Sequence, residues 1–96
     1  MNTYVILRRN GFRDVQELEQ AAARSRQAGE AMAGDVRWIR SYVLAEGGSA
    51  VGTICIYQAT GAQAIHDHAA RAALPLDEIV QVNGTVVVRP DPQAGS

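Results

Sequence analysis

The chain has 96 residues, of which 47% are hydrophobic, and this size is typical of a single domain with a thin core. Nine basic and ten acidic residues give a net charge of −1, which excludes a strong electrostatic field for nucleic acid or an anionic membrane surface. All nine basic residues are arginines, so Schiff-base chemistry, which needs a lysine amine, is excluded as well.

The single cysteine, Cys55, excludes an intrachain disulfide framework and every multi-cysteine zinc motif. The first residues do not resemble a secretion signal, and no apolar run approaches the roughly 18 residues of a membrane span. We therefore expect a cytoplasmic protein that works in a reducing compartment.

The first half of the sequence predicts a strand, a helix and a second strand. Residues 3–9 form a β-branched and aliphatic run that ends in a loop at Asn10-Gly11. Apolar residues then recur at helical spacing from Asp14, a predicted N-cap with Glu17 three residues later, to Gly34-Asp35. Residues 36–44 are rich in strand formers and predict the second strand.

The second half predicts a strand, a helix and a last strand. Residues 51–58 pair with the preceding strand as an antiparallel hairpin through the turn at 46–49. An alanine-rich helix follows, with Thr60 as its predicted cap, and ends before Pro75. A valine-rich strand over 79–89, interrupted at Asn83-Gly84, precedes a disordered tail over 90–96.

The order βαββαβ is that of an α+β ferredoxin-like fold: one domain over 1–89, with a four-stranded antiparallel sheet and two helices on one face. Strict alternation in the second strand places Trp38, Arg40 and Tyr42 on one face and Ile39 and Val43 on the other. Because both faces then carry apolar groups, we expect the face without helices to be covered by a second copy, giving a homodimer.

Several segments resemble a family of small bacterial proteins of unknown function that are related to a nickel-binding protein. These segments are Tyr4-Val5-Ile6, Trp38-Ile39-Arg40-Ser41-Tyr42-Val43, Cys55-Ile56-Tyr57-Gln58-Ala59, Ile65-His66-Asp67-His68-Ala69, Leu74-Pro75 and Ile79-Val80-Gln81-Val82. The resemblance implies a ferredoxin-like dimer with a site for a metal or a small ligand. This sequence holds only two histidines, neither of them in the first strand.

His66 and His68 are the first candidates for a metal such as nickel, because imidazole is a common ligand of transition metals. Residues two apart on a helix point in nearly opposite directions, whereas chelation by one helix needs a spacing of three or four. His68 shares the apolar stripe of its helix, so we expect it to face the sheet. It is then a core histidine, a residue of a ligand pocket or a metal ligand.

The other candidate ligand-binding residues lie on the predicted sheet. Cys55 is either a small core residue or, with His68 as its base, a nucleophile. Trp38, Tyr42 and Tyr57 line a cleft or fill a dimer seam. Arg40 needs a carboxylate, a carbonyl or an anionic ligand if its face is covered.

Three functions follow from these residues, and the third is a purely structural or interaction module whose aromatic side chains form the dimer. The first is a dimeric protein that binds a small ligand or a metal between sheet and helices near His68. The second is a small cofactor-independent enzyme of the dimeric α+β barrel type, an isomerase, cyclase or monooxygenase, with His68 or Tyr42 as acid or base. No catalytic residue is identified beyond this analogy.

Overall fold

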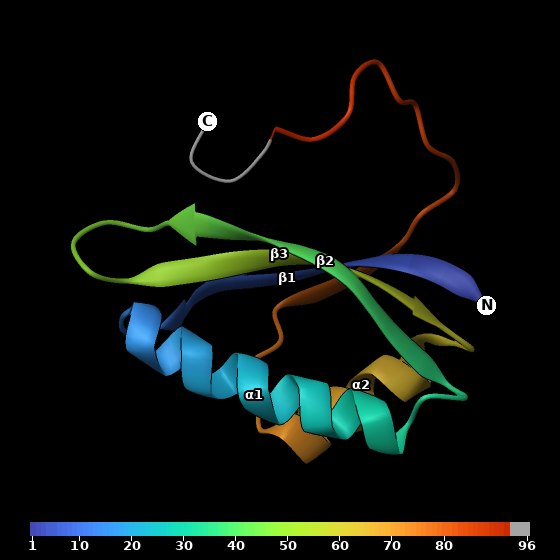
Figure 1. The fold of residues 1–96 in the computed structure, drawn as a ribbon, viewed down its shortest axis with the longest axis horizontal. Helices are drawn as coiled ribbons and strands as arrows, with labels where there is room; N and C mark the ends of the chain where they lie inside the picture. Colours follow the sequence, from blue (N-terminus) through green and yellow to red (C-terminus); the bar gives the residue numbers. More distant parts are fainter. Residues whose placement is uncertain (93–96) are drawn as a thin grey trace.

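The computed structural model describes residues 1–92 and contains four strands and two helices (Figure 1). In chain order these elements are β1 (Asn2–Phe12), α1 (Val15–Ala31), β2 (Val36–Ala45), β3 (Val51–Ala59), α2 (Ala62–Ala72) and β4 (Glu78–Gln81). The predicted tail residues 93–96 lie outside the described part of the chain. No helix within residues 1–92 is long and apolar enough to cross a membrane.

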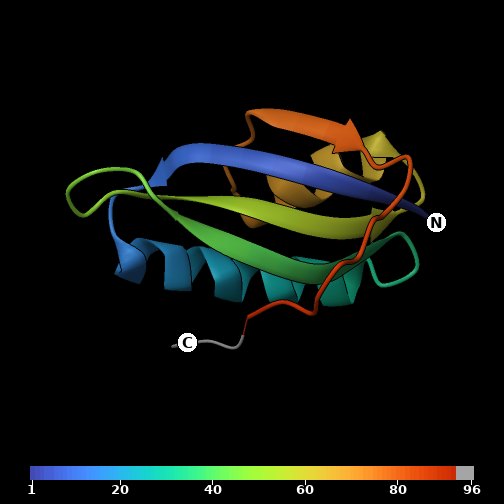
Figure 2. The same ribbon diagram turned by 90° about the horizontal axis from the view of Figure 1, so that it is seen from above.

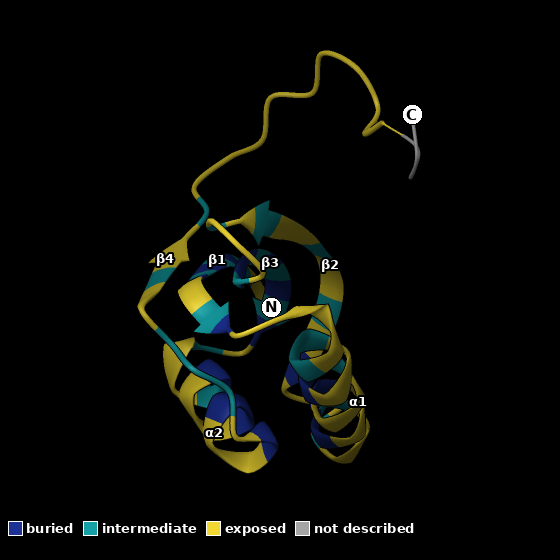
Figure 3. Cartoon of the chain, turned by 90° about the vertical axis from the view of Figure 1, so that its left-hand side faces the viewer, coloured by how far each residue is buried: buried dark blue, intermediate teal, exposed yellow. Residues whose placement is uncertain are grey.

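The strands form one antiparallel sheet in the order β2-β3-β1-β4 (Figure 2). Both helices lie against the same face of the sheet, and among residues 1–92 the opposite face carries the segment that follows β4 (Figures 1 and 3). The ferredoxin-like α+β fold expected from the element order is therefore confirmed.

β1 runs through the position where the sequence predicts a loop. Asn10 has a φ of 50°, and the pairing with β3 shifts between Arg8 and Phe12, so the segment is a bulge inside the strand. A Cβ on Gly52 of β3 would lie 2.6 Å from the carbonyl oxygen of Arg8. Only glycine allows β3 to approach the bulge this closely.

A second bulge, in β2, changes which side chains of this strand face the helices. The pairing with β3 shifts between Trp38 and Arg40, so Ile39 is an extra residue and the alternation reverses after it. Trp38 pairs with the buried Tyr57 on the helix side, whereas Arg40 and Tyr42 lie on the face without helices. The prediction that Trp38, Arg40 and Tyr42 share one face is wrong for this reason.

β4 is much shorter than the predicted strand over 79–89. It pairs with β1 from Tyr4 to Leu7, and the amide of Val82 then bonds to the carbonyl of Thr3. Because β1 begins at Asn2, the chain after Val82 has no strand left to pair with. Val86, Val87 and Val88 are consequently 92%, 75% and 85% exposed.

The sequence predicts the N-cap of α1 correctly and the N-cap of α2 incorrectly. Asp14 caps α1 as predicted, and its carboxylate accepts a 2.8 Å hydrogen bond from the amide of Glu17. The Glu17 side chain bonds instead to Arg13. α2 begins after Gly61 without a side-chain cap, so the cap predicted at Thr60 is wrong.

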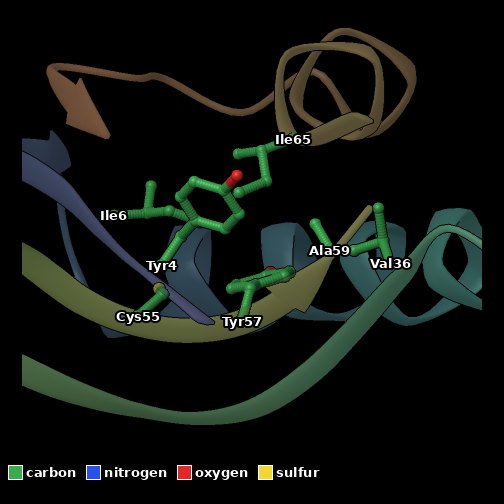
Figure 4. Close-up of a cluster of buried hydrophobic side chains, with 7 residues drawn as sticks. All are labelled: Tyr4, Ile6, Val36, Cys55, Tyr57, Ala59 and Ile65. Carbon is green, nitrogen blue, oxygen red and sulfur yellow. The ribbon is translucent and has the colours of Figure 1, made fainter. Parts of the chain in front are cut away.

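The buried side chains form two clusters between the sheet and the helices. The larger combines strands β1, β2 and β3 with α2, and Figure 4 shows its members: Tyr4, Ile6, Val36, Cys55, Tyr57, Ala59 and Ile65. The smaller lies at the start of α1 and contains Phe12, Ala21 and Val51. Residues of both clusters meet around a cavity.

Candidate functional site: a cavity between α1 and the sheet

The cavity has a volume of about 130 Å³ and almost entirely apolar walls. Its helix side is formed by Leu18, Ala21, Ala22 and Ser25 of α1, with Leu74 after α2. Its sheet side is formed by Arg8 and Phe12 of β1, Trp38, Ser41 and Val43 of β2, and Thr53, Cys55 and Tyr57 of β3. Three predicted site residues, Trp38, Cys55 and Tyr57, are therefore brought together here.

Arg8 is the charged residue of the cavity wall, and only 2% of it is exposed. Its Nε donates to the carbonyl oxygen of Pro75 at 2.8 Å, and its Nη1 donates to Sγ of Cys55 at 3.1 Å. Its Nη2 is buried without a hydrogen-bond partner among residues 1–92. Within the same residues Arg8 forms no ion pair, which is unusual for a buried guanidinium.

Sequence reasoning did not select Arg8 as a site residue, although a signal was present. Tyr4 and Ile6 occupy alternate positions of β1 and are both buried, and Arg8 is the next residue in that series. An arginine in the inward register of a strand indicates a buried charge that needs a partner.

Cys55 is a buried free thiol. Its Sγ donates to Oγ1 of Thr53 at 3.4 Å and accepts the hydrogen bond from Arg8. The imidazole of His68 is bonded to a different group, so the structure does not pair Cys55 with the base that a nucleophilic role requires.

Tyr57 connects the cavity to the second helix. Its hydroxyl lies 3.0 Å from Oγ of Ser25, and its ring stacks on Trp38 with centroids 6.1 Å apart and contacts His68 edge-on at 5.3 Å. Burial raises the pKa of the Tyr57 hydroxyl, partly offset by its hydrogen bond with Ser25 and by the charge of Arg8. The phenol therefore stays neutral, and the Tyr57 side chain forms part of the cavity wall.

His68 lies behind Tyr57, facing the sheet as the sequence predicts, and is 1% exposed. Its Nε2 lies 3.1 Å from the carbonyl oxygen of Ser25, which can only accept, so the proton is on Nε2. Its Nδ1 has no partner within residues 1–92. Burial lowers the pKa of His68, so the ring is neutral near pH 7.

The remaining candidates lie elsewhere. Arg40 and Tyr42 face away from the helices and both contact the carboxylate of Asp91, from the segment after β4. Tyr42 and His68 thus lie on opposite sides of the sheet and do not share a site. His66 is on the exposed side of α2.

Side chains that could bind a metal do not cluster within residues 1–92. No group of three or more histidine, cysteine, aspartate or glutamate side chains in residues 1–92 could hold a metal ion. The single imidazole near the cavity, His68, directs Nε2 at a backbone carbonyl, so within one copy it lacks the further ligands that nickel requires.

The comparisons with known proteins agree with the family resemblance in the sequence. The crystal structure of SCO4226 from Streptomyces coelicolor A3(2) matches with a TM-score of 0.69 and 19% sequence identity, over 88% of this chain and 99% of that chain. A search of curated proteins finds no match. Residues 4–82 match the family described as nickel responsive proteins like SCO4226, and the chain therefore belongs to this SCO4226-like family.

Proposed function

We propose that this protein is a dimeric, cytoplasmic small-molecule-binding protein whose ligand occupies the cavity between α1 and the sheet. One observation carries the proposal: residues of both core clusters line a single cavity, together with Trp38 and with Arg8, whose Nη2 has no partner in residues 1–92. An apolar pocket with a few convergent polar groups is the typical form of a small-molecule site.

A filling substitution tests this site. Ala22 lines the cavity, and the extra volume of a phenylalanine at this position occupies most of the space. Ala23 is the neighbouring residue on the exposed side of α1, so Ala23→Phe is the matched control. Trp38 is the one tryptophan of the chain and lines the cavity, so its fluorescence reports ligand entry.

We expect small aromatic compounds to change Trp38 fluorescence in the wild type and in Ala23→Phe, and not in Ala22→Phe. Equal responses from all three proteins would place the binding outside the cavity and contradict the proposed site. The absence of any response in the wild type would contradict the proposed function itself.

The proposed dimer uses the sheet face opposite the helices. Val5, Leu7, Ile54 and Ile56 are half-buried on this face, and Tyr42 and Val80 are 43% and 49% exposed there. The segment after β4, as far as residue 92, extends away from the sheet (Figure 3). Side chains of this segment and of the sheet, among them Tyr42 and Ile56, line a groove of about 700 Å³. A second copy with the same apolar face would cover these side chains symmetrically.

A cytoplasmic location is supported by the free Cys55, since a thiol without a disulfide partner is typical of reducing compartments. Separate extraction of cytoplasm and envelope from cells producing the protein, followed by immunoblotting, tests this. Recovery mainly in the envelope fraction would contradict it.

A further inference from the structure

We propose that the cavity ligand is a small organic carboxylate, whose carboxylate accepts hydrogen bonds from Arg8 while its apolar body fills the space beside Trp38. The inference rests on the proposed function and adds the chemical class of the ligand. It stands on the burial of Arg8, the identity of its present partners and the size of the cavity.

No carboxylate among residues 1–92 forms an ion pair with Arg8. Two of its nitrogens are bonded to neutral acceptors, the carbonyl of Pro75 and the sulfur of Cys55, and Nη2 has no partner in residues 1–92. Holding this charge at 2% exposure without a counter-ion among residues 1–92 costs free energy, because burial removes the guanidinium from water. An anion in the cavity beside Arg8 would offset that cost.

Neighbouring groups do not supply this anion. The thiol of Cys55 directs its proton to Thr53, so the sulfur acts toward Arg8 as a neutral acceptor. None of the residues that line the cavity is an aspartate or a glutamate. Asp77 and Glu46 are bonded to Arg9 instead, the first to its amide and the second to its guanidinium.

The charge of the site favours a carboxylate over other anions. Arg8 is the charged residue of the cavity wall, and a guanidinium donates charge-assisted hydrogen bonds to carboxylate oxygens. The single positive charge of Arg8 balances one negative charge, whereas a dianionic phosphate beside it would remain partly uncompensated. The 130 Å³ volume resembles the roughly 150 Å³ of a cavity that admits benzene in another protein, so an aromatic ring or a short branched chain fits.

The test compares two ligands of the same size. Benzoate and benzamide share the ring and a planar head group, but only benzoate carries a charge. Both are titrated against the wild type, Arg8→Met and the matched control Arg37→Met, with Trp38 fluorescence as the readout. Arg37 is an exposed residue of β2 outside the cavity wall.

We expect the wild type and Arg37→Met to bind benzoate at least about tenfold more tightly than benzamide, and Arg8→Met to lose this preference. Equal binding of the two compounds by the wild type would overturn the carboxylate assignment and leave the small-molecule function standing. Failure of both compounds to bind would overturn the assignment and the proposed function together. The wild-type comparison alone is decisive if Arg8→Met does not fold.

Discussion

Nη1 of Arg8 lies 3.1 Å from Sγ of Cys55, so a neutral thiol occupies a position at which a buried arginine usually meets a carboxylate. The contact joins the inward faces of β1 and β3, where Ile6 pairs directly with Cys55. The positive charge of Arg8 is therefore one that a bound anion, rather than another residue of the fold, would balance.

Arg8→Met should therefore stabilise the protein when no ligand is present. Methionine fills a similar volume without a desolvation penalty, and replacing buried charges by apolar residues often adds 1 kcal/mol or more. The loss of the hydrogen bond to Pro75 offsets part of this gain. We expect the melting temperature to rise by about 4–8 °C, the shift that about 1 kcal/mol produces in a domain of this size.

Differential scanning calorimetry on Arg8→Met, with Arg37→Met as the surface control, measures this effect. A fall of the Arg8→Met melting temperature well below that of the control would mean that Arg8 holds the fold together, and would contradict its role as a site residue.

His68 should make stability depend on pH above the range in which carboxylates titrate. Its pKa is lowered in the folded state, chiefly by burial, so the unfolded chain binds a proton more readily. The stability it contributes is fully present above its ordinary pKa of about 6.5 and is lost as pH falls through that value toward the folded pKa.

Urea unfolding at several pH values between 5 and 8 measures this dependence. In His68→Gln the slope in this window should flatten, whereas His66→Gln, which changes an exposed residue of the same helix, should retain the wild-type slope. If the dependence of unfolding free energy on pH were lost in His66→Gln alone, the assignment of His68 to the buried side of α2 and of His66 to its exposed side would be wrong.

Residue spacing in the sequence predicted much of the fold, and each wrong prediction has a local structural cause. Helical spacing after Asp14 and the strand runs around it were enough to predict all six elements in order. The end of β4 was not predictable from its valines, because strand length there is set by where β1 begins, at Asn2. Pairing partners, rather than propensity, decided that boundary.

The candidate site shows the same limit. Trp38, Cys55 and Tyr57 were predicted and do line one cavity, whereas Arg40 was placed with Trp38 by strict alternation. The bulge at Ile39 reversed that alternation, and no residue type at this position indicates an extra residue in the pairing. The exposed pair Arg40 and Asp91 joins segments far apart in sequence, which periodicity cannot reveal.

The dimer prediction depends on the sheet face opposite the helices. Val80→Glu places a charge on that face, whereas Val15→Glu places the same charge on the exposed start of α1, where the valine is 54% exposed. Sedimentation velocity at micromolar concentration should show a dimer for the wild type and Val15→Glu and a monomer for Val80→Glu. A monomeric wild type would contradict the proposal.

Nickel should bind weakly to the protein. His66 and His68 lie on opposite sides of α2, and the described residues contain no cluster of three metal-binding side chains that could complete a site in one copy. Calorimetric titration of tag-free protein with nickel measures the affinity. Submicromolar binding would contradict this prediction and indicate ligands shared between two copies.

A crystal structure of the wild type grown with benzoate tests the central claim most directly, because it locates the ligand as well as detecting it. The account predicts density for a planar molecule between α1 and the sheet, with its carboxylate at hydrogen-bond distance from the guanidinium of Arg8 and its ring beside Trp38. Benzoate found only elsewhere on the molecule, with the cavity empty or closed by movement of α1, would contradict it.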